Sequence, residues 1–278
     1  MSERAPDGQD DLAAELARLR EENARLRGLL ALDERTSGGH AVAWSPTLLA
    51  DGASTPHVNA SSPDDAKLAL LTSLFGARSD VYATRWQNAS TGRTGWSPAT
   101  RGGWSRRRSR QDHLPLTDDV FTAHLQGRVE IGIYPLLRGD TCALLACDFD
   151  KGTWVLDALA YLDACHANGV PAALERSRSG NGGHVWIFFD GLVAAADARS
   201  LGAALLRQAM STRAELDLAS YDRFFPSQDY LPKAGFGNLI ALPLQGQSAT
   251  RGNTLFLDPT TLQPWPDQWA FLSSVARL

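Results

Sequence analysis

The amino-acid sequence predicts an α+β domain in which helices cover one face of a sheet. Beyond residue 117 the chain alternates between apolar strand patterns and helical patterns in the order ββαββα, followed by further short strands. That order indicates a sheet with its helices on one side. The chain of 278 residues, 44% of them apolar, is also long enough to bury a sizeable core.

Residues 1–34 predict a short coiled-coil helix. Its seam residues recur at alternating spacings of four and three: Leu12, Leu16, Leu19, Asn23, Leu26 and Leu30. An asparagine at an a position favours a two-stranded parallel pairing, so a homodimer through residues 12–30 is one interpretation. The other is an amphipathic helix packed on its own domain, because about three heptads are marginal alone.

Residues 35–63 are rich in Gly, Ser, Thr, Ala and Pro and predict a flexible linker. The functional domain is therefore expected at 64–278. It begins with a helix at 64–75 and a strand at 81–86. The following segment, TGRTGWSPATRGGWSRRRSR, has turn residues and a basic run and predicts a surface loop region.

The regular pattern after residue 117 supplies the remaining elements. We expect strands at 132–137 and 143–149, a helix at 153–168, strands at 172–177 and 184–189, a helix at 194–213, and short strands at 221–225, 238–242 and 254–257. This order resembles the RNA-recognition type of fold, with its antiparallel sheet, more than a Rossmann fold.

Charge and cysteine usage exclude several classes of protein. Residues 1–34 carry 5 Arg and 9 Asp or Glu, which leaves 22 basic and 22 acidic residues of the 27 and 31 in the chain. This neutral remainder argues against a sequence-independent DNA coat protein. Cys142, Cys147 and Cys165 lie in apolar segments without CxxC spacing, so neither disulfides nor zinc are expected. Without a signal peptide or membrane-spanning segment, we expect a cytoplasmic protein.

The segment LLACDFDKG places Asp148 and Asp150 two residues apart at the end of a strand. Both carboxylates then project from one face of the sheet, while Phe149 points into the core. Two adjacent carboxylates repel each other unless a divalent cation lies between them. The alternative is that they only end the strand and cap the next helix.

A glycine-rich turn follows in ERSRSGNGGHVWIFF. Its glycines let backbone amides approach an anion, while arginine, serine and histidine side chains can bind phosphate oxygens. The candidate nucleotide-binding residues here are Arg176, Arg178, Ser179, Gly182, Gly183 and His184. A hairpin turn with a structural histidine is the alternative.

A third carboxylate would complete a site for two cations. Asp222 starts a predicted strand that can lie beside the Asp148 strand, whereas Asp229 lies in a loop, where it can act as a turn former. Asp222 is favoured, and Asp229 stays open. Lys233 and Asn238, in or beside that loop, are added as candidate nucleotide-binding residues.

The basic run predicts contacts with nucleic acid. Single-stranded DNA could be followed by charge and stacking through Trp104, Arg106, Arg107, Arg108 and Arg110. A solvated basic loop explains the same residues equally well.

Residues 64–278 resemble the archaeo-eukaryotic primases, whose three motifs are an hDhD strand, an SxH-like turn and a later hD strand. CDFD, SGNGGH and YD occur in this order. The likeness is greatest to the primase-polymerase domains of TOTE conflict systems, which share YPLL, DFDK, ERSRSGNGGHVWIFF and GFGNLIALPLQ. Family members often carry a cysteine cluster that is absent here, so no zinc is expected. The leucine-rich helix also looks like the usual leader of that family.

The resemblance implies a DNA primase-polymerase that joins nucleoside triphosphates on a single-stranded or primed template. Asp148, Asp150 and Asp222 would hold two Mg²⁺ or Mn²⁺ ions. Helicase or nuclease activity would come from separately encoded proteins. Two rival functions are a metal-dependent nuclease or phosphodiesterase, and a non-catalytic DNA-binding module.

Overall fold

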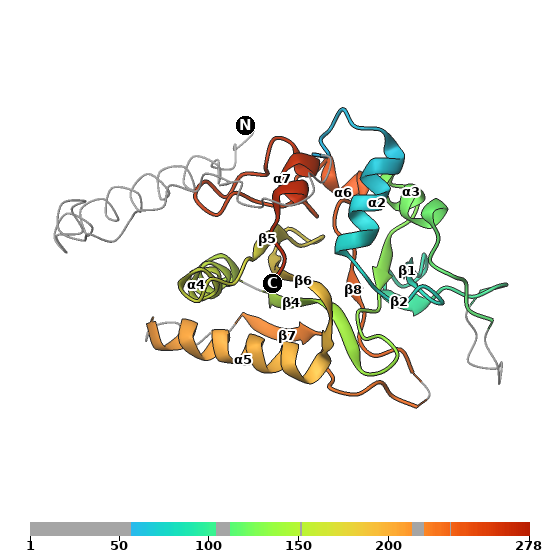
Figure 1. Ribbon diagram of the computed structural model, residues 1–278. Coiled ribbons are helices and arrows are strands. Elements are labelled where there is room, and N and C mark those ends of the chain that lie inside the picture. Colours follow the sequence, from blue (N-terminus) through green and yellow to red (C-terminus); the bar gives the residue numbers. More distant parts are fainter. Residues whose placement is uncertain (1–56, 104–111, 151, 213–219, 234) are drawn as a thin grey trace, which may run out of the picture. The chain divides into compact units, whose positions relative to one another are not determined.

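The computed structural model describes residues 57–103, 112–150, 152–212, 220–233 and 235–278. The chain divides into two compact units, residues 1–52 and 53–278, and all described residues belong to the second. The predicted coiled coil, most of the linker, Trp104 and the four arginines of the basic run therefore lie outside the described residues. Within them the fold is mixed α and β, with two antiparallel sheets (Figure 1).

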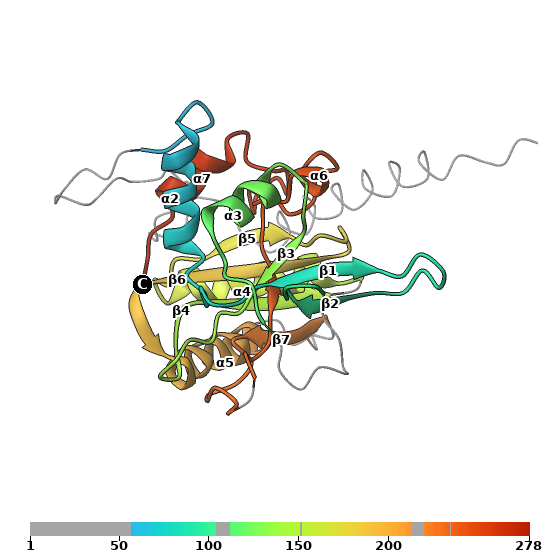
Figure 2. The same cartoon turned by 90° about the vertical axis from the view of Figure 1, so that its right-hand side faces the viewer.

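The first sheet has the strand order β2-β1-β3-β8. Its strands are β1 (Ala83–Gln87), β2 (Thr94–Pro98), β3 (Ile131–Ile133) and β8 (Ile240–Ala241). The prediction of a surface loop after residue 90 is wrong for residues 94–98. These residues form β2, which pairs with β1 as an extended hairpin (Figure 2). Turn residues dominate this segment, but the indole of Trp86 covers Gly95, where a Cβ atom would lie 2.6 Å from the ring. Cross-strand packing thus overrides the weak strand propensity.

The second sheet has the strand order β5-β6-β4-β7. It contains β4 (Thr141–Asp150), β5 (Ala173–Arg176), β6 (Gly182–Ala194) and β7 (Tyr221–Phe225). Two helices, α4 (Trp154–Ala167) and α5 (Ala195–Thr212), lie side by side against one face (Figure 1). On this face Cys147, Phe149 and Ile187 are fully buried with Tyr161 of α4. Burial of each large apolar side chain contributes about 2 kcal/mol.

The opposite face of the second sheet carries Ala146, Trp186 and Phe188. They pack beneath helix α2 (Asp64–Leu74), where the ring of Phe75 meets Trp186 edge to face at 5.1 Å. Helix α3 (Asp118–Leu125) lies on this same side, away from α5 (Figure 2). The alternation of side chains along β4 therefore continues from this apolar patch towards Asp148 and Asp150.

Three further differences separate the predicted and observed elements. Residues 254–257 form isolated bridges to Glu175 and Pro264 instead of a strand. Helices α3, α6 (Gly246–Ala249) and α7 (Gln268–Ser274) were not predicted, because each is too short to show a helical period. Residues 58 and 60 donate backbone hydrogen bonds to Ser273 Oγ and Asp267 Oδ2, so the end of the predicted linker is attached to the α7 region. None of the described helices combines the length and the apolar character that crossing a membrane requires.

His124 of α3 ties that helix to the first sheet. It is fully buried, and its Nδ1 accepts the backbone N–H of Ile131 at 3.2 Å, while Nε2 lies 3.0 Å from the Pro243 carbonyl. This pairing requires a neutral ring that carries its proton on Nε2. Burial lowers the pKa of His124 to about 4.

This pKa makes the stability of the domain depend on pH. Between pH 6.5 and about 4 the unfolded chain binds a proton that the folded chain does not, so stability is lost as the pH falls through this window. Urea unfolding should show a loss of about 2 kcal/mol from this residue between pH 7 and pH 5. The His124→Gln variant, although less stable at pH 7, should lack that part of the decline. His166→Gln, at an exposed position of α4, is the matched control, and an equal decline in both variants would contradict the assignment.

Candidate active site

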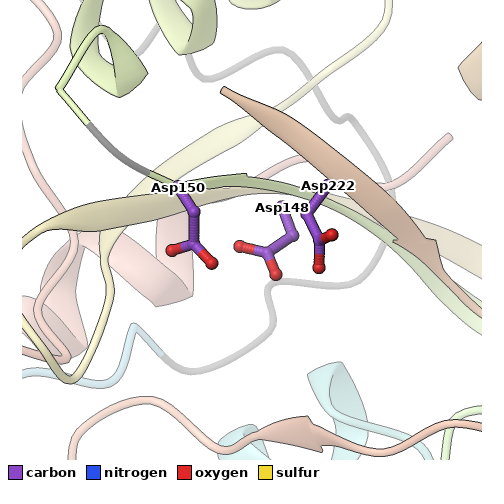
Figure 3. Close-up of side chains that lie close together, drawn as sticks. All are labelled: Asp148, Asp150 and Asp222. Carbon is purple, nitrogen blue, oxygen red and sulfur yellow. The ribbon is translucent and has the colours of Figure 1, made fainter. Parts of the chain in front are cut away.

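Three carboxylates gather on the face of the second sheet that is not covered by α4 and α5. Asp148 and Asp150 come from the end of β4 and Asp222 from the start of β7, and all three point to the same side (Figure 3). One oxygen atom from each lies within 4.8 Å of the others. Asp148 is the most enclosed, with 13% of its side chain exposed, compared with 42% for Asp222.

A β-bulge brings Asp222 into this group. Asp148 pairs with Arg223, and Phe149 pairs with Tyr221, so Asp222 is an extra residue in β7. In a regular ladder Asp222 would lie opposite Phe149 and share the face that α4 covers. A bulge redirects the side chain of the extra residue, and here the carboxylate comes to the face of Asp148.

A buried network fixes the start of β7 against the end of β4. The backbone N–H of Asp150 donates to the carbonyl of Ser220 at 2.7 Å. Asp157 of α4 is buried and accepts from the Ser220 hydroxyl and from Thr153 Oγ1. Asp157 is thus a structural carboxylate that sequence reasoning did not identify, and it holds the strand end from which Asp222 projects.

The three carboxylates are electrostatically unfavourable in this arrangement. Burial raises the pKa of Asp148 to about 6, against the lowering effect of His184. The other carboxylates nearby raise it further: Asp150, Asp222 and Glu175. A divalent cation between these oxygens would remove the repulsion and favour the ionised form of Asp148. Hard oxygen donors of this kind suit Mg²⁺ or Mn²⁺, so the residues present fit such an ion.

His184 is held between two carboxylates. It lies opposite Asp148 on β6, with 3.4 Å between His184 Nε2 and Asp148 Oδ1. On its other side, Nδ1 lies 2.5 Å from Oε2 of Glu175, which also accepts from the indole N–H of Trp186 at 3.3 Å. Burial alone lowers the pKa of His184, but the Glu175 and Asp148 carboxylates outweigh it and raise that pKa to about 9. The two neighbouring carboxylates therefore favour the protonated form of the ring.

Glu175 is a second residue that sequence reasoning missed. It is 2% exposed, in the middle of the apolar strand β5, opposite His184 in the register of β5 and β6. The signal that could have revealed it is a carboxylate inside an apolar strand, since buried charges are retained only with partners.

The glycine turn is shaped by what surrounds it. A Cβ atom on Gly182 would lie 2.5 Å from Oδ1 of Asp150, and one on Gly183 would lie 2.4 Å from the ring of Trp154. Both positions therefore need glycine for close approach. Ser179 Oγ accepts the backbone N–H of Asn181 at 3.2 Å, which stabilises the turn itself.

The two arginines before the turn diverge. Arg178 pairs with Glu130, whose carboxylate precedes β3, with 3.0 Å between Arg178 Nε and Glu130 Oε1. It thus connects the turn to the first sheet. Arg176 pairs with Gly183 in the sheet, on the face opposite to Glu175, and its guanidinium donates to the carbonyls of residues 252 and 262. The structure does not bring Arg176 to the carboxylates.

Lys233 and Asp229 lie towards the other end of β4. The backbone N–H of Leu231 donates to Asp140, the residue before β4, at 2.7 Å, and Asp229 pairs with Arg199 of α5. Lys233 lines a cavity in this region. Asn238 is half-buried just before β8. Of the two candidates for the third carboxylate, Asp222 is the one that joins Asp148 and Asp150.

Comparison with family models agrees with the motifs. The family model described as the archaeo-eukaryotic primase domain of the TOTE conflict system matches residues 66–278. No curated protein matches the chain. Among solved structures, the chain is similar to the polymerase domain of Mycobacterium tuberculosis Ligase D in complex with DNA, with 16% identity, a TM-score of 0.38, and coverage of 77% of this chain and 83% of that chain. The family match spans most of the sequence and includes every residue of the carboxylate site. The chain therefore belongs to the archaeo-eukaryotic primase domain family of TOTE conflict systems.

Proposed function

We propose that the chain is a DNA primase-polymerase, a nucleotidyltransferase that extends a strand on a DNA template with the help of two divalent cations. The observation that carries this proposal is the convergence of Asp148, Asp150 and Asp222 on one sheet face, next to the ring of His184. Negative groups that hold cations therefore adjoin a positive group that can bind phosphate, which is the charge pattern that phosphoryl transfer requires.

The three aspartates would hold the cations, Mg²⁺ or Mn²⁺. When bound, the cations would neutralise the charge on the α-phosphate and on the leaving pyrophosphate and lower the pKa of the attacking 3′-hydroxyl. The protein itself would then mainly position the reacting groups and supply charged side chains around them. The burial of Asp148 strengthens its interaction with a cation, and the bulge holds Asp222 at the shared face.

His184 and Arg178 are the proposed triphosphate contacts, with Ser179, Gly182 and Gly183 forming the turn against which the phosphates lie. Glu175 is a positioning residue, because its hydrogen bond to Nδ1 fixes the orientation of the His184 ring. Arg176, Lys233 and Asn238 were predicted for the same role. The carbonyl contacts of Arg176 and the distant place of Lys233 argue for Arg178 as the principal cation of the turn.

The sheet also supports the finer assignment of fold. The order β4-α4-β5-β6-α5-β7, with antiparallel pairing throughout, is consistent with the RNA-recognition type of sheet. The remaining proposals concern partners. The basic run with Trp104 would contact template DNA, residues 12–30 would form a homodimer, and separately encoded proteins would supply helicase or nuclease activity.

The central test incubates the protein with a single-stranded template, labelled nucleotides and Mn²⁺. Product should form, and an Asp148→Ala, Asp150→Ala double variant should lose at least about a hundredfold in rate, since several kcal/mol of charge stabilisation disappear. Absence of product in the wild type, or equal product from the variant, would sink the proposal. Shortening of labelled DNA without any need for nucleotides would favour a nuclease instead.

A second experiment separates the two candidates for the third carboxylate. Asp222→Asn keeps the size of the side chain but removes its charge from the shared face, so the extension rate should fall by about a hundredfold or more. Asp229→Asn only breaks an ion pair with Arg199. That variant should stay within about threefold of the wild type, since partly exposed pairs contribute little. The reverse ranking would exclude Asp222 from the site.

Glu175 is tested through kinetics that a purely structural residue would not change. Glu175→Gln preserves shape but weakens the hold on His184, so KM for the nucleotide should rise by about tenfold with a smaller change in kcat. His184→Asn should give a similar KM, and the double variant should add little, because both changes interrupt one interaction. Additive effects in the double variant would show that Glu175 acts independently of His184.

A further inference from the structure

A cavity of about 490 Å³ lies apart from the carboxylate site. Its basic lining consists of Arg78, Arg138, Lys233 and His113, and Phe236 forms an apolar wall. This volume is in the range of pockets that hold small ligands. The lining comes from four separate segments of the chain, so the cavity is a product of the tertiary fold.

Two of the cations are held in place by one carboxylate. Arg78 is 7% exposed and donates from Nε and Nη2 to the two oxygens of Asp80, at 2.8 and 2.5 Å. Arg138 donates to the same carboxylate at 3.2 Å. These hydrogen bonds hold the pKa of Asp80 well below its usual range. A charged Asp80 thus orients two guanidinium groups at the cavity, while the exposed Lys233 adds a third positive charge.

The Phe236 wall contacts two polar side chains, Arg78 and His113. The ring of Phe236 lies 5.0 Å from the guanidinium carbon of Arg78 and 4.8 Å from the ring of His113, edge to face. In the part of the chain that the structure describes, nothing hydrogen-bonds the buried Nδ1 of His113. A buried polar atom without a partner is costly, and a ligand in the cavity would supply one.

The balance of charge favours an anion. Asp80 offsets one of the three cations, and Asp140 is engaged by the backbone N–H of Leu231. Arg78 is buried, whereas Arg138 and Lys233 are exposed, so the positive excess can meet an anion that arrives from solvent. Guanidinium groups recognise phosphate through paired hydrogen bonds, so phosphate is the anion that this lining suits best.

The cavity and the carboxylates lie towards opposite ends of β4. Asp140 beside the cavity and Asp148 are eight residues apart along β4, or about 25 Å at the usual rise of a strand. A nucleic-acid strand covers that distance with about seven nucleotides at a 3.4 Å rise. A nucleic-acid strand bound at the carboxylates is therefore long enough to place a phosphate at the cavity as well.

We propose that this cavity is a second phosphate-binding site, which takes a phosphate group of nucleic acid at a fixed distance from the carboxylate site. The proposal rests on the proposed function only in taking nucleic acid as the ligand. Either a terminal 5′-phosphate or a backbone phosphate would fit the lining, and the experiment below distinguishes them.

The test measures binding of the full chain to a 16-nucleotide single strand, labelled at its 3′ end, in EDTA. One strand carries a 5′-phosphate and the other a 5′-hydroxyl. The variant is Arg138→Ala with Lys233→Ala, because both residues are exposed and the buried Arg78 keeps its pair with Asp80. The matched control, Arg207→Ala with Arg277→Ala, removes two exposed arginines from α5 and from the carboxyl-terminal segment.

The variant should bind at least about tenfold more weakly than the control, and the slope of log K against log salt should shrink by about 0.7, because one phosphate contact is lost. A loss confined to the phosphorylated strand assigns a terminal phosphate, and an equal loss for both strands assigns a backbone phosphate. Variant affinities equal to those of the control for both strands would overturn the proposal. Because EDTA removes the cations and only binding is measured, this outcome is independent of whether the protein transfers nucleotides.

Discussion

The antiparallel pairing of β4 with its neighbours β6 and β7 is the interaction on which the site depends. It places His184 opposite Asp148 on one side and, through a bulge, Asp222 beside Asp148 on the other. A shift of one residue in either register would turn these side chains into the apolar layer beneath α4 and α5. The two buried clusters on opposite faces of the sheet make such a shift costly, because every large apolar side chain would change face with them.

The same pairing concentrates charge that the fold must compensate. Asp148 lies among three further carboxylates, and its raised pKa reflects that crowding together with burial. His184 supplies one positive neighbour, and Arg223 supplies another through a 2.7 Å hydrogen bond from Nε to Asp222. Glu175 in turn holds His184. The chain of alternating charges from Glu175 to Arg223 is a structural reason why these polar groups can remain at the edge of an apolar core.

The basic cavity illustrates a different use of a carboxylate. At the candidate site, three aspartates bring oxygen atoms within 4.8 Å of one another, where a cation could bind, whereas Asp80 is already paired with Arg78 and Arg138. The first arrangement attracts cations, and the second presents guanidinium groups to an anion. The two ends of β4 therefore differ in charge, with carboxylates at one end and guanidinium groups near the other.

The sequence by itself determined the strands and helices that a pattern of neighbouring residues predicts. The alternation in LLACDFD puts Asp148 and Asp150 on one face, and the observed β4 and α4 lie within two residues of the predicted bounds. The motif order likewise identified the family, which the family match confirms. The glycines of the turn were recognisable because glycine is the residue that permits close approach to the backbone, although the sequence does not show that Asp150 and Trp154 are the neighbours.

Only the tertiary structure decided the features that depend on register and packing. Asp222 joins the site through an extra residue in β7, which no local pattern distinguishes from a regular strand. Arg176 and Arg178 are two residues apart and look equivalent in the sequence, yet their strand and turn positions send one to backbone carbonyls and the other to Glu130. Glu175 and Asp157 gained their roles from partners distant in the sequence or across a strand pair. A side chain's function here follows from its neighbours in space, which local propensity and spacing do not encode.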